Sequence, residues 1–230
     1  MRPVGDGAMD MAAAADGAMV APAFEARLPG SGFGARLTKR VFDLVLATLL
    51  LIVAAPLLLV NALLIKIDSP GPILYRSRRI GRNGEAFEMV KFRTMFDGAD
   101  RQREALRAIS EAPEGLFKVT RDPRLTRIGR LLRSTSLDEL PQLFHVVTGT
   151  MSLVGPRPLV SEESALIPSE NGRFVARPGI TGPWQLAGSW RVPIPAMVKL
   201  DVEYIDSWSV WLDIKLLVRT VSYSVRRVGV

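Results

Sequence analysis

The sequence predicts a mostly helical α+β fold that is attached to a membrane near its N-terminus. Three observations predict it: a long uncharged apolar run over residues 44–65, two β-capable runs joined by Asn83-Gly84, and several amphipathic helical segments. A chain of 230 residues can bury one core with appendages, so we expect a single functional site.

The composition narrows the chemistry that this site can use. The chain has no cysteine and one histidine, His145, which excludes disulfides, cysteine nucleophiles and zinc clusters and leaves little room for histidine chemistry. Its net charge of +7 attracts polyanions such as nucleic acid, anionic lipid or phosphorylated small molecules. A mean hydropathy of +0.19 is high for a soluble basic domain, so a membrane is favoured over nucleic acid.

Residues 1–38 differ in composition from the rest of the chain. They are rich in Ala, Gly, Met and Pro and show neither helical nor strand periodicity, which predicts a disordered tail. The glycines of "GSGFG" (30–34) follow no predicted strand and lack the spacing of a dinucleotide-binding loop, so a flexible linker is favoured. We expect no signal peptide, because the long apolar run begins only at residue 44.

The apolar run over residues 44–65 has 22 residues without a charge, about 33 Å as a straight helix and enough to cross a bilayer. Pro56 lies near its middle and bends a helix there. Basic residues flank both sides, whereas a single crossing places its positive flank on one side. We therefore favour a re-entrant membrane helix over 39–67 that breaks at Pro56, ahead of a plain span or a buried soluble helix, followed by one domain over 68–230. The flanking residues are Arg36, Lys39 and Arg40, then Lys66, Arg76, Arg78, Arg79 and Arg82.

Residues 72–95 contain the hairpin signal. Two β-capable runs meet at Asn83-Gly84, which predicts two antiparallel strands with a tight turn. The basic side chains of this hairpin are interpreted mostly as a solvated face. Residues 101–112, "RQREALRAISEA", are predicted to form an ordinary amphipathic helix.

Residues 122–136 are predicted to form a second amphipathic helix. Its apolar residues fall within an arc of ~120° and its arginines lie opposite, which suits an interfacial helix beside anionic lipid and equally a helix packed on a soluble core. The apolar residues are Leu125, Ile128, Leu131 and Leu132, and the arginines are Arg127, Arg130 and Arg133.

Three later segments each have two interpretations. The Pro/Gly-rich loops over 151–160 and 177–185 hold backbone amides and an arginine in fixed positions, which suits phosphate binding and structural turns alike. The segment 197–221 places aromatic residues at helical spacings, as in a packed core or in an anchor at lipid headgroups. These aromatic residues are Tyr204, Trp208 and Trp211.

The carboxylate pair Asp138-Glu139 also has two interpretations. Ser136 and Glu139 fit a capping box that only starts a helix. A carboxylate in the first turn of a helix is also close to a favourable phosphate site, where Asp138 could attack phosphorus and Glu139 could hold Mg²⁺. The spacing leaves both open. In the second case the phosphate charge would be met by Lys91, Arg133 and Arg157.

At this point the chain resembles a known family, the bacterial sugar transferases, also called monotopic phosphoglycosyl transferases. The resemblance extends over about residues 38–221, and it is specific because many motifs occur in order. They are "KRVFDLVLA", "SPGPILYRSRRIG", "FEMVKFRTM", "DPRLTRIGRLLRSTSLDELPQL", "MSLVGPRPLV", "RPGITGPWQLAG" and "YIDSWSVWLDIKLL".

The resemblance implies an enzyme of the bacterial inner membrane, with a re-entrant helix broken at Pro56, interfacial helices and an active site on the cytoplasmic face. It implies transfer of a hexose-1-phosphate from a UDP-sugar to polyprenyl (undecaprenyl) phosphate, with release of UMP, as the first membrane step of exopolysaccharide or other surface glycan assembly. Asp138 would form a covalent phospho-sugar intermediate, and Glu139 would assist through Mg²⁺. The implied substrate-binding residues are Lys91, Arg93, Arg133, Gln142 and Arg157.

Three residues depart from the family pattern. Ser77 replaces a frequent glutamine, His145 a common asparagine, and Pro183 the usual leucine or a similar residue. The changes at His145 and Pro183 are expected to alter the nucleotide or sugar pocket, so the sugar stays open, with galactose and glucose favoured. Downstream glycosyltransferases are expected as partners, and a homodimer is left open.

Two other functions compete with the enzyme. One is a basic peripheral membrane protein whose arginines bind lipid and whose "SLDE" only caps a helix. The other is a nucleic-acid binder, against which the apolar run argues, so no nucleic acid is expected as a partner.

Overall fold

The computed structural model describes residues 32–113, 115–169 and 171–228. The predicted tail over residues 1–31 lies outside this part of the chain. Helix α2 (Phe33–Asp68) begins inside the segment predicted as tail, so the prediction of disorder is wrong for residues 33–38, which are helical.

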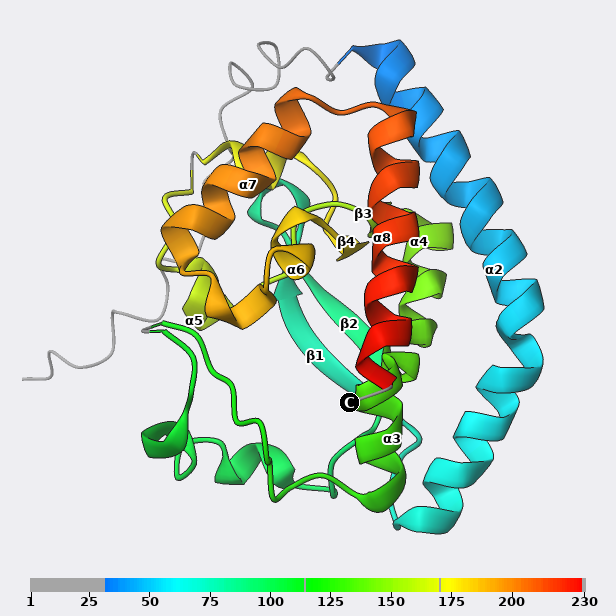
Figure 1. Cartoon of the computed structure of the whole chain (residues 1–230), viewed down its shortest axis with the longest axis vertical. Coiled ribbons are helices and arrows are strands. Elements are labelled where there is room, and N and C mark those ends of the chain that lie inside the picture. Colours follow the sequence, from blue (N-terminus) through cyan, green and yellow to red (C-terminus); the bar gives the residue numbers. More distant parts are fainter. Residues whose placement is uncertain (1–31, 114, 170, 229–230) are drawn as a thin grey trace, which may run out of the picture.

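Helix α2 has 36 residues and is the one helix in the described part of the chain that is long and apolar enough to cross a membrane. It runs through Pro56 without interruption and bows along one side of the molecule (Figure 1). A proline inside a helix favours such curvature. Its apolar side chains are mostly exposed, with Val53 at 77% and Leu59 at 73%, unlike a helix buried in a soluble core. The structure thus has a continuous bowed helix instead of a break at Pro56, and a re-entrant path stays a prediction.

The predicted hairpin is confirmed. Strands β1 (Leu74–Ile80) and β2 (Ala86–Phe92) pair antiparallel, with Tyr75 opposite Lys91. At the turn η1 (Arg82–Gly84), Asn83 and Gly84 both have positive φ, 57° and 78°. Asn and Gly tolerate this left-handed region best, which is why this pair marks the turn.

A second, parallel sheet was not predicted. It consists of β3 (Ser152–Val154) and β4 (Gly179–Thr181), which come from the two Pro/Gly-rich loops. These loops lie so close that a Cβ at position 179 would be 2.1 Å from the Gly155 nitrogen. The glycines in both motifs therefore permit the contact between the two loops.

The other helices surround these sheets (Figure 1). Residues 101–112 do not form the predicted amphipathic helix and contain only short 3₁₀ turns. Ile109 is 57% exposed, so this segment has no buried apolar face to stabilise a helix. The helices are α3 (Arg127–Thr135), α4 (Leu143–Thr148), α5 (Ser161–Ser164), α6 (Pro183–Leu186), α7 (Ile194–Asp206) and α8 (Val210–Val228), and the 3₁₀ turns are η2 (Ala99–Gln102), η3 (Arg107–Ile109), η4 (Leu137–Gln142), η5 (Gly172–Val175) and η6 (Ser189–Arg191).

Helix α3 begins later than predicted. Thr126 caps its N-terminus by accepting the Gly129 N–H at 2.9 Å, while Asp122 and Arg124 form a buried ion pair ahead of it. Of the predicted apolar face, Leu132 is 1% exposed and packs on Phe92 and Ile65, whereas Leu131 is 52% exposed. This helix therefore packs on the core through part of that face.

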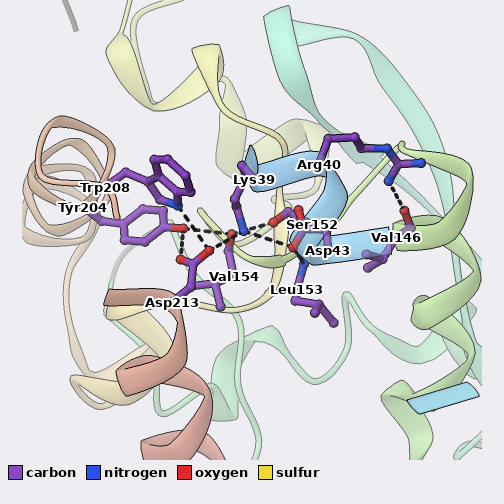
Figure 2. A network of polar contacts seen from close by, with 10 residues as sticks. All are labelled: Lys39, Arg40, Asp43, Val146, Ser152, Leu153, Val154, Tyr204, Trp208 and Asp213. Atoms are coloured by element: carbon purple, nitrogen blue, oxygen red, sulfur yellow. Dashed lines mark hydrogen bonds and ion pairs between the residues drawn. The ribbon is translucent and has the colours of Figure 1, made fainter. Parts of the chain in front are cut away.

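The N-terminal part of α2 is tied to the rest of the molecule by a buried set of polar residues, which we call the anchor network: Lys39, Asp43, Tyr204, Trp208 and Asp213 (Figure 2). The Lys39 ammonium lies 3.1 Å from Asp43 and 2.7 Å from Asp213. Tyr204 and Trp208 donate to Asp213 at 2.6 and 3.2 Å, and Asp43 accepts the Leu153 N–H at 3.1 Å. Each carboxylate is thus both ion-paired and hydrogen-bonded.

Two interpretations from the sequence are corrected. Lys39 and Arg40 are not only a positive flank of the membrane segment, because Lys39 belongs to the anchor network and Arg40 donates to the Val147 carbonyl at 2.7 Å. The aromatic residues of 197–221 also divide between two helices, since a turn separates α7 from α8. Tyr204 is buried, whereas Trp211 is 73% exposed and remains available as an anchor at lipid headgroups.

The C-terminal end of α2 is tied down as well. Asp68 accepts the Ile128 N–H at 3.0 Å, at the start of α3. Just beyond the helix, the buried Arg93 donates to the carbonyls of Ser69 and Pro70, each at 2.8 Å. Both ends of the apolar helix are therefore attached to the same domain.

Candidate active site

A cleft of about 410 Å³ lies between the hairpin, η4, the segments 93–103 and 116–119, and residues of the later loops and helices. Tyr75, Ser77 and Arg79 line it from alternate positions of β1, as expected for one face of a strand. Asp138 and Glu139 line it from η4. The other charged residues that line it are Lys91, Arg93, Asp97, Asp100, Arg103, Lys118, Arg133, Arg157 and Glu163.

The turn ahead of the carboxylate pair is not the predicted capping box. Ser136 has φ 59° and ψ 16°, and its side chain makes no capping hydrogen bond. A side-chain N-cap needs extended backbone, and here the left-handed residue ends α3 through its own N–H instead. Its carbonyl accepts the Glu139 N–H at 3.2 Å, so η4 starts directly at this turn. The tight junction between the two helices brings Asp138 and Glu139 to the cleft.

The two carboxyl groups are in a desolvating environment. Asp138 is 6% exposed, and burial raises its pKa, against the lowering effect of Lys91 and Arg133. The pKa of Glu139 is raised by burial and then by the charge of Asp138. Each group therefore gains from nearby positive charge, and a second negative charge beside it is unfavourable.

Lys91 supplies part of that positive charge. Its ammonium lies 5.5 Å from the centre of the Tyr75 ring, its partner across the hairpin. Burial, and then the charge of Arg133, lowers its pKa to about 8. A cation that is desolvated and repelled by another cation is stabilised by an anionic ligand.

Arg157 and Arg79 form a second group of cations. Arg157 lies over the Trp184 ring at 5.6 Å. Burial, and then the charge of Arg157, lowers the pKa of Arg79 to about 10. Arg79 donates to the Pro158 carbonyl at 3.3 Å, while its buried Nε has no hydrogen-bond partner among the described residues. From the sequence, Arg79 was interpreted as a flanking charge of the membrane segment and as part of the solvated basic face of the hairpin. Its strand position, two residues after Ser77, places it on the cleft face instead.

Two other predicted substrate-binding residues are placed differently. Arg93 reaches the edge of the cleft, but its guanidinium donates to Ser69 and Pro70, so its contacts hold the end of α2. Gln142 is 3% exposed and is not among the described residues that line the cleft. A substrate role for these two residues stays a prediction.

The residues present suit Mg²⁺ better than a metal held by protein ligands alone. The described residues contain no group of three or more His, Asp or Glu side chains arranged to hold a metal. Asp138 and Glu139 offer carboxylate oxygens in a cleft rich in cations that suit phosphate. Mg²⁺ commonly binds through one or two carboxylates together with substrate phosphates, and this donor set fits that arrangement.

Known proteins are similar to this chain over most of its length. The chain is 44% identical over 197 residues to the UDP-glucose:undecaprenyl-phosphate glucose-1-phosphate transferase of Caulobacter vibrioides, covering 80% of this chain and 68% of that protein. It is 40% identical over 190 residues to the exopolysaccharide production protein ExoY of Sinorhizobium fredii, covering 80% and 84% of the two chains.

A third relative is longer. The undecaprenyl-phosphate galactose phosphotransferase of Salmonella typhimurium is 41% identical over 199 residues, which cover 84% of this chain and 42% of that protein. This chain thus spans less than half the length of that relative. The family model described as bacterial sugar transferase matches residues 34–227, from the start of α2 to the end of α8, and the chain therefore belongs to the bacterial sugar transferase family.

Proposed function

We propose that the protein transfers a hexose-1-phosphate from a UDP-sugar to polyprenyl phosphate and releases UMP. The printed names of the relatives from Caulobacter and Salmonella describe reactions of this type on undecaprenyl phosphate. The observation that carries the proposal is the cleft, where repelling cations surround two desolvated carboxyl groups. Such a site is suited to a diphosphate beside a nucleophilic carboxylate.

The proposed reaction has two displacements at one phosphorus atom. A carboxylate oxygen of Asp138 attacks the phosphorus that carries the sugar, and the bond from that phosphorus to the UMP oxygen breaks. An oxygen of polyprenyl phosphate then attacks the same phosphorus, and the bond to Asp138 breaks. The product is a polyprenyl-diphosphate sugar, and Asp138 is regenerated as the free carboxylate.

The surrounding residues have separate roles in this proposal. Lys91 and Arg133 lie near enough to Asp138 to lower its pKa, so they favour the ionised nucleophile and bind phosphate oxygens. Arg157 and Arg79 bind the remaining phosphate charge. Glu139 would hold Mg²⁺, which when bound neutralises charge on the diphosphate and on the leaving UMP.

The acceptor requires contact with a membrane, and α2 supplies the apolar surface. Because both ends of α2 are attached to the same domain, through Asp43 and through Asp68, we propose that the helix dips into the membrane and returns to one face. By family resemblance this is the cytoplasmic face. The chain has no native cysteine, so single cysteines at Arg36 and Arg82 can be labelled from one side of sealed vesicles. Labelling of both from the same side is expected, and labelling from opposite sides would refute the re-entrant path.

The reaction itself is tested by UMP release from a panel of UDP-sugars, with polyprenyl phosphate in detergent micelles. UDP-glucose and UDP-galactose are expected to be turned over, and Asp138→Asn is expected to abolish UMP release because an amide is a poor nucleophile. Undiminished turnover by that variant would remove Asp138 from the nucleophile role. Liposome binding without turnover of any UDP-sugar would instead favour a non-catalytic peripheral membrane protein.

A further inference from the structure

The one histidine of the chain lies behind the cleft, on α4. The Nε2 atom of His145 accepts the Val90 N–H at 3.0 Å. The ring also packs edge-on against Phe87, with centroids 5.8 Å apart and planes at 72°. His145 is therefore joined to β2 by a directional polar contact and an aromatic contact.

This contact determines the state of the imidazole. A backbone N–H can only donate, so Nε2 must carry no proton and the proton of the neutral ring lies on Nδ1. Burial lowers the pKa of His145, which agrees with a neutral ring. Among the described residues the hairpin sheet has two strands, so the side of β2 away from β1 has no strand partner. The imidazole satisfies an N–H group on that open edge.

The contact lies one residue from a side chain of the cleft. Lys91 follows Val90 directly, and its ammonium lines the cleft beside Asp138. In an extended strand, a shift of the backbone at one residue moves the side chain of the next. A fixed Val90 therefore limits the positions open to the Lys91 ammonium. His145 itself is not among the described residues that line the cleft, so its effect on the substrate would be indirect.

We propose that neutral His145 is a positioning residue that holds β2 at Val90 and thereby places the Lys91 ammonium for phosphate binding. The inference rests on the proposed function, because it assigns Lys91 to phosphate. It also refines the expectation that a histidine at this position alters the nucleotide pocket, because the change acts through β2 and not by contact.

Two substitutions with side chains of similar length separate the effect of the hydrogen bond to Val90 from the effect of packing. His145→Gln can place an amide oxygen near the position of Nε2, whereas His145→Met fills similar space with a poor acceptor. The probe is the affinity for UDP, which has no sugar-1-phosphate to transfer, measured by calorimetry on the full chain in detergent. We expect His145→Gln to stay within about twofold of the parent and His145→Met to bind UDP about fivefold more weakly, as for the loss of one hydrogen bond.

A double-mutant cycle with Lys91→Met separates positioning from general loosening. If His145 acts through Lys91, His145→Met weakens UDP binding in the Lys91 background and adds nothing once Lys91 is methionine. An equal loss in both backgrounds, or no loss in either, would overturn the proposal. Absence of UDP binding by the parent would instead contradict the proposed function, so the two failures can be told apart.

A measurement on the parent protein avoids variants that fail to fold. Because His145 is the one histidine of the chain, ¹⁵N-histidine labelling of untagged protein gives the signals of a single imidazole. We expect the neutral tautomer with the proton on Nδ1. Observation of a proton on Nε2 at neutral pH would exclude the contact with Val90 and with it the proposal.

Discussion

The cleft and the anchor network both gather charged residues away from water, yet they satisfy them in opposite ways. In the anchor network, Lys39 lies between Asp43 and Asp213, and every charge has an ionic or hydrogen-bond partner within the protein. In the cleft, Lys91 is repelled by Arg133 and Arg79 by Arg157. The first arrangement is complete in itself and suits a role in stability, whereas the second leaves mutually repelling positive charge that an anionic ligand would offset.

The same substitution in the two regions provides the sharpest test of this difference. Lys39→Met leaves the buried Asp43 and Asp213 without their cation, and removing one partner of a buried ion pair destabilises a protein by about 3–5 kcal/mol. We expect the melting temperature in detergent to fall by about 6–20 °C. Lys39→Met combined with Asp213→Asn should recover part of the loss, because one uncompensated charge is removed. An unchanged melting temperature in Lys39→Met would show that the anchor network does not stabilise the fold.

Lys91→Met is expected to do the reverse. Loss of a preorganised cation beside the reacting phosphorus should lower kcat/KM for UMP release by about 100–1000-fold. The melting temperature should change little, because the lost attraction to Asp138 and Glu139 is offset by relief from burial and from repulsion by Arg133. If Lys91→Met were strongly destabilised, the cleft would be a structural network as well, and the contrast between the two regions would disappear.

Arg79 tests whether the second group of cations binds substrate. Arg79→Gln should lower kcat/KM about tenfold, as for the loss of a charge-assisted hydrogen bond. Arg78→Gln is the matched control, because Arg78 directly precedes Arg79 on the strand and is exposed on the other face. Equal effects of the two substitutions would point to the overall positive charge of the hairpin instead of a defined contact.

The sequence predicted the parts of the fold that have strong local signals. The uncharged apolar run over 44–65 is long enough to predict a membrane helix, and Asn83 and Gly84 adopt the positive φ that the hairpin turn requires. The parallel pair β3 and β4 could not be predicted in the same way. Its strands have three residues each, and they pair through the close approach of Gly155 and Gly179, which are distant in sequence. The helix predicted over 101–112 was wrong for a different reason, because the apolar Ile109 of its pattern remains exposed and does not pack on the core.

In the candidate site, too, sequence motifs predicted residues that lie together in the structure, whereas features that depend on tertiary contacts were not predicted. Family motifs identified Asp138, Lys91 and Arg157, and the structure brings these residues together in one cleft. The capping box was wrong because Ser136 also has to end α3, a requirement that the "SLDE" pattern does not contain. The role of Asp43 was missed because its partners, Leu153 and Lys39, are brought to it by the tertiary structure and by the helix repeat.

The smallest expected effect concerns the pH dependence of the cleft. With a pKa of about 8, Lys91 is mostly charged at pH 7 and loses its proton as the pH rises. If the ammonium binds phosphate, kcat/KM should fall with rising pH, by about twofold between pH 7 and pH 8. In Lys91→Arg this alkaline limb should be absent, because a guanidinium stays charged over that range. If the alkaline limb persisted in Lys91→Arg, it would be due to another titrating group. Lys91 would then resemble Lys39 of the anchor network, whose charge is satisfied within the protein.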